Sequence, residues 1–312
     1  ELDGPWIRAT LGGTTLTAMT RGYLHGKVGL LADRPAAFFS VRVEAEEKET
    51  AAHSRRRRAD EQTLAELREG YSQPVLWSAF ETPGFGVGRN IRFGDIDGDG
   101  EKEIVIAQVV AHGERDEYSE TGCITAVKTD GTVLWQSGEP DPANYRLTND
   151  VAFQVHDIDG DGVCEVIYAR DFELVIADGR TGRVRRKVPT PAAKPPADRF
   201  ERILGDCLFF CDMRGTGRAA DIVIKDRYWH FWVYDDELHP LWEASCNTGH
   251  YPYAFDVDGD GRDELAMGYS LFDDDGSLLW TLDDRLDEHT DGVAILDFAE
   301  APGSRPRILY AA

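Results

Sequence analysis

The 312-residue sequence predicts an all-β protein, a β-propeller built of four-stranded antiparallel blades, with a short N-terminal helix. Two observations predict this fold: an acidic, glycine-containing loop recurs along the chain, and a β-rich run follows each copy of it. The first aspartates of the loops fall at positions 95, 157, 212, 256 and 297, so the spacings are 62, 55, 44 and 41 residues. Four antiparallel strands at a period of roughly 40 residues or more are typical of a propeller blade.

The N-terminal segment, residues 1–80, is predicted to hold strands and a helix. Residues 26–47 and 74–80 have the composition of strands. Residues 49–70 are good helix formers that end on a glycine, and the run of four arginines among them is interpreted as solvated surface. The N-terminal strands could close the ring together with the C-terminal segment. Alternatively, the natural protein continues past Ala312, which we favour.

Residues 81–312 are predicted to form the blades. Each unit has an apolar run entering the loop, a β-rich run such as EIVIA (103–107), a third strand, a turn and a last strand. Asp-Gly and Thr-Gly pairs supply the positive φ that tight hairpin turns need. Four units are full and the fifth stops after its second strand, whereas a complete ring would have about six to eight blades. Packing between neighbouring blades is predicted for four tryptophans near blade ends: Trp77, Trp135, Trp242 and Trp280.

Three of the loops carry acids at alternate positions, as in FGDIDGDGEKEIVIAQ (93–108). Carboxylates crowded in this way repel one another unless a cation lies among them, and Ca²⁺ takes hard oxygen ligands. We therefore predict about three structural Ca²⁺ ions, by analogy with the alternate ligands of an EF-hand. The side-chain ligands would be Asp95, Asp97, Asp99 and Glu103, then Asp157, Asp159, Asp161 and Glu165, then Asp256, Asp258, Asp260 and Glu264. The carbonyl ligands would be those of Glu101, Val163 and Arg262.

Two further loops keep the frame of the repeat and lose its acids, since Arg214 replaces the second acid of one and Pro306 interrupts the other. No ion is assigned to them. In the three acidic loops the last acid stands at the ninth position and a strand follows at once, so these are strand-loop-strand sites and not EF-hands.

Composition and charge limit the classes of partner. The formal net charge of −23 argues against nucleic acid or an anionic membrane surface as a partner. No apolar run approaches the roughly 20 residues of a membrane span, so we expect no membrane insertion.

The five cysteines lack a framework spacing and are interpreted as mostly buried thiols. The sequence starts at Glu1, so either a signal peptide has been removed or the chain was cut from a longer one; we expect an extracellular or periplasmic location. The sequence does not predict an oligomeric state.

The acidic loops resemble the calcium-binding FG-GAP repeats of integrin-type β-propellers. A narrower likeness covers residues 225–298, from KDRYWHFWVYDDELHPLWE through NTGHYPYAFDVDGDGRDELAMGYSLFDDDGSLLW to HTDGVAILDF. This stretch resembles the calcium-dependent rhamnogalacturonan lyases, and the resemblance implies a propeller that cleaves a pectin backbone by β-elimination. It differs at Gly249-His250-Tyr251-Pro252, where an Asn-His pair is expected before the loop.

Strand geometry predicts where a substrate would bind. A strand advances about 3.3 Å per residue, so residues six to eight positions before a loop's first aspartate lie roughly 20 Å from the metal, at the rim of the central channel. β-Elimination from a uronic acid needs a base, a proton donor for the leaving oxygen and a group that neutralises the carboxylate. We predict His250 as the base, Tyr251 or Tyr253 as the donor, and Arg89 or His289 as the neutralising group. Substrate contacts are predicted for Asn90, Asn149, Asp150 and Asp291.

Two alternatives stay open for these residues. A histidine at a strand start is often a hydrogen-bonded structural residue, and the aromatic run RYWHFWVY (227–234) alternates as a core strand does, although one of its faces could stack on sugars. The whole protein could also be a non-catalytic glycan-binding or adhesion module, whose rim only binds a polysaccharide or oligosaccharide. The predicted function is that of a secreted, calcium-stabilised polysaccharide lyase that acts on a uronate-containing glycan.

Overall fold

A computed structural model describes residues 2–3, 6–11, 13–19, 47–113, 118–286, 288–296 and 306–311. The chain divides into two compact units, Glu1–Val75 and Leu76–Ala312. Most of the predicted strand at 26–47 lies outside the described residues. Among the helices described, none combines the length and the apolar composition needed to cross a lipid bilayer.

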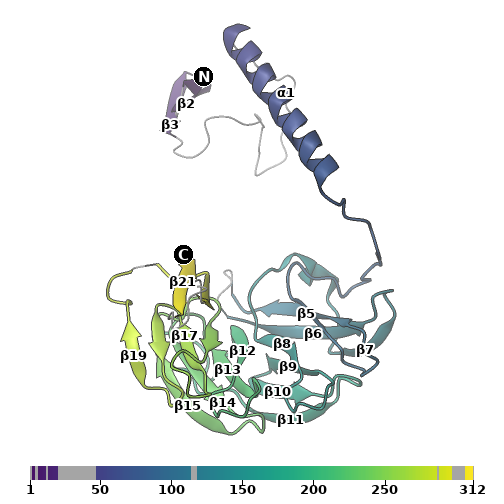
Figure 1. The fold of residues 1–312 in the computed structure, drawn as a ribbon, viewed down its shortest axis with the longest axis vertical. Helices are drawn as coiled ribbons and strands as arrows, with labels where there is room; N and C mark the ends of the chain where they lie inside the picture. Colours follow the sequence, from purple (N-terminus) through teal and green to yellow (C-terminus); the bar gives the residue numbers. More distant parts are fainter. Residues whose placement is uncertain are drawn as a thin grey trace. The chain divides into compact units, whose positions relative to one another are not determined.

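The N-terminal unit contains a small antiparallel sheet and one helix (Figure 1). The sheet comprises β1 (Leu2–Asp3), β2 (Trp6–Leu11) and β3 (Thr14–Met19). Helix α1 (Glu47–Gly70) has 24 residues, none of them buried, and is longer than the predicted 49–70 helix. Glutamates in its first turn and Arg68 in its last turn complement the helix dipole. Its arginine run is exposed.

The second unit consists of four four-stranded antiparallel sheets and a two-stranded one (Figure 1). The first sheet has β4 (Ile91–Gly94), β5 (Glu103–Ala111), β6 (Ser119–Val127) and β7 (Val133–Ser137). A 3₁₀ helix, η1 (Pro142–Arg146), follows it. The second has β8 (Phe153–His156), β9 (Glu165–Arg170), β10 (Glu173–Ala177) and β11 (Val184–Pro189). The third has β12 (Cys207–Cys211), β13 (Asp221–Lys225), β14 (His230–Tyr234) and β15 (Pro240–Ser245).

The fourth sheet has β16 (Tyr253–Phe255), β17 (Glu264–Met267), β18 (Ser270–Phe272) and β19 (Leu278–Thr281), and the last sheet pairs β20 (Gly292–Leu296) with β21 (Arg307–Ala311). In every four-stranded sheet the strands pair in sequence order. The described part of the chain is therefore all-β apart from α1 and η1, as the repeat predicted.

The hydrophobic core lies between successive sheets. One cluster joins the first and second sheets through residues such as Val105 and Phe153, and another joins the second and third through Ile167 and Ile222. A third cluster joins the third and fourth sheets, with Phe231 at its centre. Because the middle strands are covered on both faces, they read as continuous apolar runs, whereas the last strand of each four-stranded sheet is more exposed.

Two blade-end tryptophans link neighbouring sheets as predicted. Trp135 Nε1 in β7 donates to the carbonyl of Gly179 in the second sheet's turn at 2.7 Å. Trp242 Nε1 in β15 donates to the carbonyl of Asp274 in the fourth sheet's turn at 2.7 Å. The prediction for Trp77 is wrong: its side chain is 82% exposed. Residues 74–80 form no strand, because no neighbouring strand pairs with them among the described residues.

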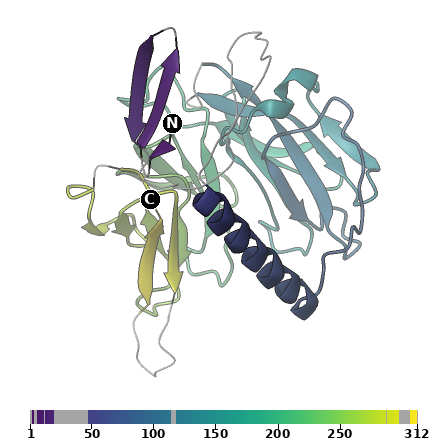
Figure 2. The same ribbon diagram turned by 90° about the horizontal axis from the view of Figure 1, so that it is seen from above.

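The first strands of successive sheets contact one another in the order β4, β8, β12, β16 and β20. In Figures 1 and 2 the green sheets lie between the teal first sheet and the yellow C-terminal strands. This succession brings the segments that precede the first strands toward one another, although they are far apart in the sequence.

Candidate functional site

Polar side chains stand before the first strand of four of the five sheets in the second unit. They come from the segments that the sequence predicts to form a rim. They are Arg89 and Asn90 before β4, Asn149 and Asp150 before β8, His250 and Tyr251 before β16, and His289 and Asp291 before β20.

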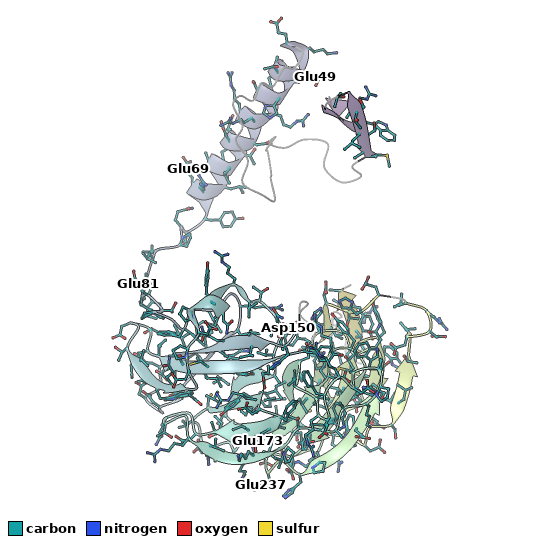
Figure 3. All side chains as sticks on the ribbon, turned by 180° about the vertical axis from the view of Figure 1, so that it is seen from behind. Glu49, Glu69, Glu81, Asp150, Glu173 and Glu237 are labelled. Atoms are coloured by element: carbon teal, nitrogen blue, oxygen red, sulfur yellow. The ribbon has the colours of Figure 1, made fainter. Side chains whose placement is uncertain are left out.

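Asp150 is the centre of this group, and its label in Figure 3 lies between the first sheet and the last strands. One carboxylate oxygen of Asp150 is 2.8 Å from His250 Nδ1 and the other is 3.0 Å from Arg89 Nη1. The Asp150 side chain is only 3% exposed, while that of Arg89 is 50% exposed. A buried carboxylate is stable here because two basic groups from two other sheets face it.

A second histidine and a second aspartate stand on the outer side of His250. The His250 and His289 rings are 5.1 Å apart between centroids. The Nε2 atoms of both histidines lie 3.9 Å from Asp291 Oδ1, and the Asp291 side chain is 70% exposed. These three ligand atoms are close enough together to hold a metal ion.

The Asp150 contact decides how His250 can act. A carboxylate accepts hydrogen bonds, so Nδ1 of His250 is the donor and Nε2 is left to face solvent on the side of Asp291. An imidazole held in this tautomer by a buried carboxylate can take a proton at Nε2. Arg89 is half exposed beside the other oxygen of Asp150, and the partly buried His289 lies beside the ring of His250.

The remaining predicted rim residues are more deeply placed. Burial raises the pKa of Tyr251 to about 12, so its phenol stays protonated through the neutral range. Tyr253 lies in β16 and packs against the buried Ala266, Leu271 and Ile295. Asn90 is 1% exposed and donates to the carbonyl of Asn149 at 3.0 Å. Asn149 in turn donates to Ser119 Oγ at 2.8 Å.

The structure adds Tyr228, which the sequence did not single out. Its ring lies 4.7 Å from that of His289 and 5.9 Å from that of His250, at right angles to the latter. The Arg227 guanidinium lies 4.9 Å from the same ring. The aromatic run 227–234 was a signal: its alternation indicated mainly a core strand, with the alternative that one face could stack on sugars. Tyr228 precedes β14 and belongs to the turn after β13, where the alternation no longer applies.

Three acidic loops bring carboxylates together in the way a metal site requires. Ligand atoms converge within 4.8 Å in three groups: Asp95, Asp97 and Asp99; Asp157, Asp159 and Glu165; Asp256, Asp258 and Asp260. Asp161 stands outside the second group. Glu103 accepts from the backbone N–H of Ile96, and Glu264 from that of Val257. Gly98 and Gly100 have φ of 78° and 88°, which lets the first loop turn its N–H groups onto Asp95.

The donor set of these loops fits a hard cation such as Ca²⁺. In two loops a basic side chain of the protein lies against the acids. Lys128 Nζ is 3.0 Å from Asp97 Oδ2 and 2.9 Å from Asp99 Oδ2. Arg185 pairs with Asp159 at 3.0 Å and with Glu165 at 2.5 Å. Even so, burial, with a smaller contribution from the Asp159 carboxylate, raises the pKa of Glu165 to about 7.

The third loop differs, since no ion pair among the described residues joins a basic side chain to its aspartates. Arg262, within this loop, pairs instead with Asp274 at 2.6 Å. Burial raises the pKa of Glu264 to about 6.

The loop before β13 contains its own cation. Arg214 Nε lies 2.5 Å from Asp221 Oδ1, and Arg214 Nη2 lies 2.8 Å from Asp236 Oδ1. Asp221 is completely buried at the start of β13, as Glu103 is buried at the start of β5. A guanidinium of this loop therefore lies against the buried carboxylate of Asp221.

No family model matches the chain. Among curated proteins it is 27% identical to the rhamnogalacturonan exolyase YesX of Bacillus subtilis, over 60% of this chain and 39% of that protein. It is 24% identical to the rhamnogalacturonan endolyase YesW of the same organism, over 60% of this chain and 38% of that protein. The matches therefore span about two fifths of these relatives' length.

A solved rhamnogalacturonan lyase of Bacillus licheniformis, PL11, has a similar fold, with a TM-score of 0.54 at 22% identity, over 77% of this chain and 49% of that one. The sequence matches confirm the resemblance to rhamnogalacturonan lyases that the sequence itself indicated.

Proposed function

We propose that this chain is part of a calcium-stabilised polysaccharide lyase, which cleaves a uronate-containing glycan by β-elimination. The observation that carries the proposal is the buried Asp150, which joins the half-exposed Arg89 to His250. The similarity to enzymes named rhamnogalacturonan lyases supports the same substrate class.

In the proposed reaction His250 Nε2 removes the C5 proton of a uronic acid. The electron pair of that C–H bond forms the C4–C5 double bond, the bond between C4 and the glycosidic oxygen breaks, and the leaving oxygen takes a proton from Tyr251 or Tyr253. Arg89 or His289 neutralises the carboxylate, because charge at that carboxylate develops as the proton leaves. Asn90, Asn149, Asp150 and Asp291 complete the proposed site; of these, Asp291 has the side chain most open to a ligand.

The architecture we propose is a β-propeller with integrin-type calcium repeats, each four-stranded sheet being one blade. Contacts between the first strands of successive sheets, and a core between the sheets, support it. We also propose residues 81–312 as the blades, the last of them incomplete, and residues 1–80 as an N-terminal segment of strands and a helix.

Calcium in the three acidic loops would be structural, because the loops connect the first two strands of their sheets. The ions would neutralise the aspartates and hold these strand pairs together. We place the protein outside the cytoplasm, since a charged polymer of this kind does not cross the apolar interior of a membrane.

The test is to incubate the protein, with Ca²⁺, with a panel of uronate polysaccharides and to follow the ultraviolet absorbance of the unsaturated product. We expect product from at least one rhamnogalacturonan, and loss of that product in His250→Ala. His239→Ala is the matched control, because His239 is 74% exposed and pairs only with Asp235 among the described residues. Binding of the polysaccharide without any product would contradict the lyase and favour a glycan-binding module.

A further inference from the structure

A shallow concave pocket with a cavity volume of about 50 Å³, open to solvent, lies beside the rim residues. It is lined by three aromatic side chains, those of Tyr118, Phe200 and Trp229. Arg202, Asp206 and Arg227 supply charged groups in the same wall. Large aromatic surfaces with a few polar groups are the usual composition of a small-ligand site.

The pocket adjoins the candidate site on two sides. Ser119, in the pocket wall, accepts from Asn149, the residue next to Asp150. On the other side, the Tyr228 ring lies between the Arg227 guanidinium, at 4.9 Å, and the His289 ring, at 4.7 Å. A polymer held at His250 would therefore have its neighbouring residue within reach of this pocket.

The charge of the pocket is positive although the protein carries a net charge of −23. Asp206 is shared by two buried cations, with Lys225 Nζ at 2.7 Å and Arg227 Nη1 at 2.8 Å. The second acid of the wall, Asp226, is 2.5 Å from His230 Nδ1. The two carboxylates offset the two cations Lys225 and Arg227, so the excess positive charge that would attract an anion comes from Arg202.

Arg202 supplies this positive charge at the exposed edge of the pocket. Its Nη1 donates to the main-chain carbonyl of Thr190 at 2.5 Å, and within the described part of the chain it forms no ion pair with a carboxylate. A guanidinium has five N–H donors in a planar fork, so one such bond leaves donors for a bidentate contact with a ligand carboxylate.

Two of the aromatic side chains, Tyr118 and Phe200, pack edge to face, and the third, Trp229, is partly exposed. Phe200 lies 5.7 Å from Tyr118, and the Arg199 guanidinium lies 4.9 Å from the Tyr118 ring and 5.4 Å from the Phe200 ring. Trp229, from the turn before β14, is 37% exposed. These rings offer rigid surfaces that pack against the C–H faces of a pyranose at little cost in side-chain entropy.

We propose that this pocket binds one uronic acid residue of an anionic glycan, with its carboxylate on Arg202 and its ring against Trp229. The inference rests on the proposed function for the identity of the polymer, but the binding itself does not require catalysis. On this strongly acidic protein, Arg202 would give an acidic polysaccharide a local positive charge beside the rim.

The test is isothermal titration calorimetry of the protein, with Ca²⁺, against digalacturonate and against neutral galactobiose. Digalacturonate is expected to bind at least about tenfold more tightly, as one charge-assisted contact is worth roughly 1.5–3 kcal/mol. Arg202→Gln is expected to remove that preference, and Trp229→Ala to weaken both sugars. Arg285→Gln is the matched control, since Arg285 is 74% exposed and is not part of the pocket wall.

Equal affinity for the two sugars, or an unchanged affinity for digalacturonate in both Arg202→Gln and Trp229→Ala, would overturn the proposal. These experiments distinguish a failure of the pocket proposal from a failure of the proposed lyase activity. Binding that depends on Arg202 but yields no unsaturated product supports the pocket and contradicts the lyase. Product formed with an unchanged KM in Arg202→Gln supports the lyase and contradicts the pocket.

Discussion

His250 Nδ1 lies 2.8 Å from Asp150 Oδ2, although 100 residues of chain separate the two. Asp150 comes from the segment before the second sheet and His250 from the segment before the fourth. The contact orients the imidazole and stabilises the charge it would gain as a base.

The first prediction concerns Asp150→Asn. An amide has no negative charge to stabilise an imidazolium and can also select the wrong tautomer, so the rate of product formation should fall by about two to four orders of magnitude. The measurement is the initial rate by ultraviolet absorbance. Asp284→Asn, at a 76% exposed side chain, is the control and should keep the wild-type rate. A rate within a factor of two of wild type in Asp150→Asn would contradict the role of the pair.

Removal of calcium is expected to lower the melting temperature. A single site at 100 times its Kd stabilises the folded state by about 2.7 kcal/mol, and several sites add to this value. The measurement is the melting temperature in chelator and in excess Ca²⁺, with Mg²⁺ as the comparison, because the smaller ion demands a stricter geometry. Identical melting temperatures in chelator and in Ca²⁺ would mean that these loops bind no structural ion.

Lys128→Met is expected to raise the affinity of the first loop for Ca²⁺ and to destabilise the calcium-free protein. Lys128 pairs with both Asp97 and Asp99, so an arriving ion must displace it, and without it the acids repel one another. Calcium titration by calorimetry together with melting in chelator measures both effects. Lys187→Met removes an exposed pair with Glu173 away from the acidic loops and should change neither. Unchanged calcium affinity in Lys128→Met would show that the lysine does not compete.

Arg214→Met is expected to reduce the free energy of unfolding by about 3 kcal/mol, because the buried Asp221 loses its cation. Added Ca²⁺ should not restore the loss. Adding Asp221→Asn to Arg214→Met should recover part of the lost free energy of unfolding, because the unpaired charge is then removed. Arg186→Met removes a surface pair with Glu237 and should cost about 1 kcal/mol or less. An equal loss in the two arginine variants, measured by urea unfolding, would contradict this role of Arg214.

The raised pKa of the Tyr251 phenol predicts that the stability of the protein depends on pH. Burial raises its pKa to about 12 from a model-peptide value of about 10, so the unfolded chain loses this proton first. The contribution of the buried phenol to the free energy of unfolding is therefore complete below about pH 10 and is lost as the pH rises toward 12. Urea unfolding of the wild type and of Tyr251→Phe at neutral and alkaline pH should show their difference changing over that range. A constant difference would contradict the buried phenol.

The elements of the sheets were largely predictable from the sequence because strands and turns are local. The run EIVIA became β5, and EVIYA became part of β9, since a central strand is apolar on both faces. The alternating aspartates placed their carboxylates together because they stand two residues apart in a loop bent by glycines. The prediction of a strand at residues 74–80 was wrong, because local composition does not say whether a partner strand exists.

The sequence by itself determined the repeat, the acidic loops and the segments at which a rim could form. Only the tertiary structure decided that Asp150 joins Arg89 to His250, that Tyr228 lies beside both histidines, and that Lys128 and Arg185 reach into the loops. The physical reason is that strand periodicity reports which face of a sheet a residue occupies, whereas these contacts depend on the packing of one sheet against another.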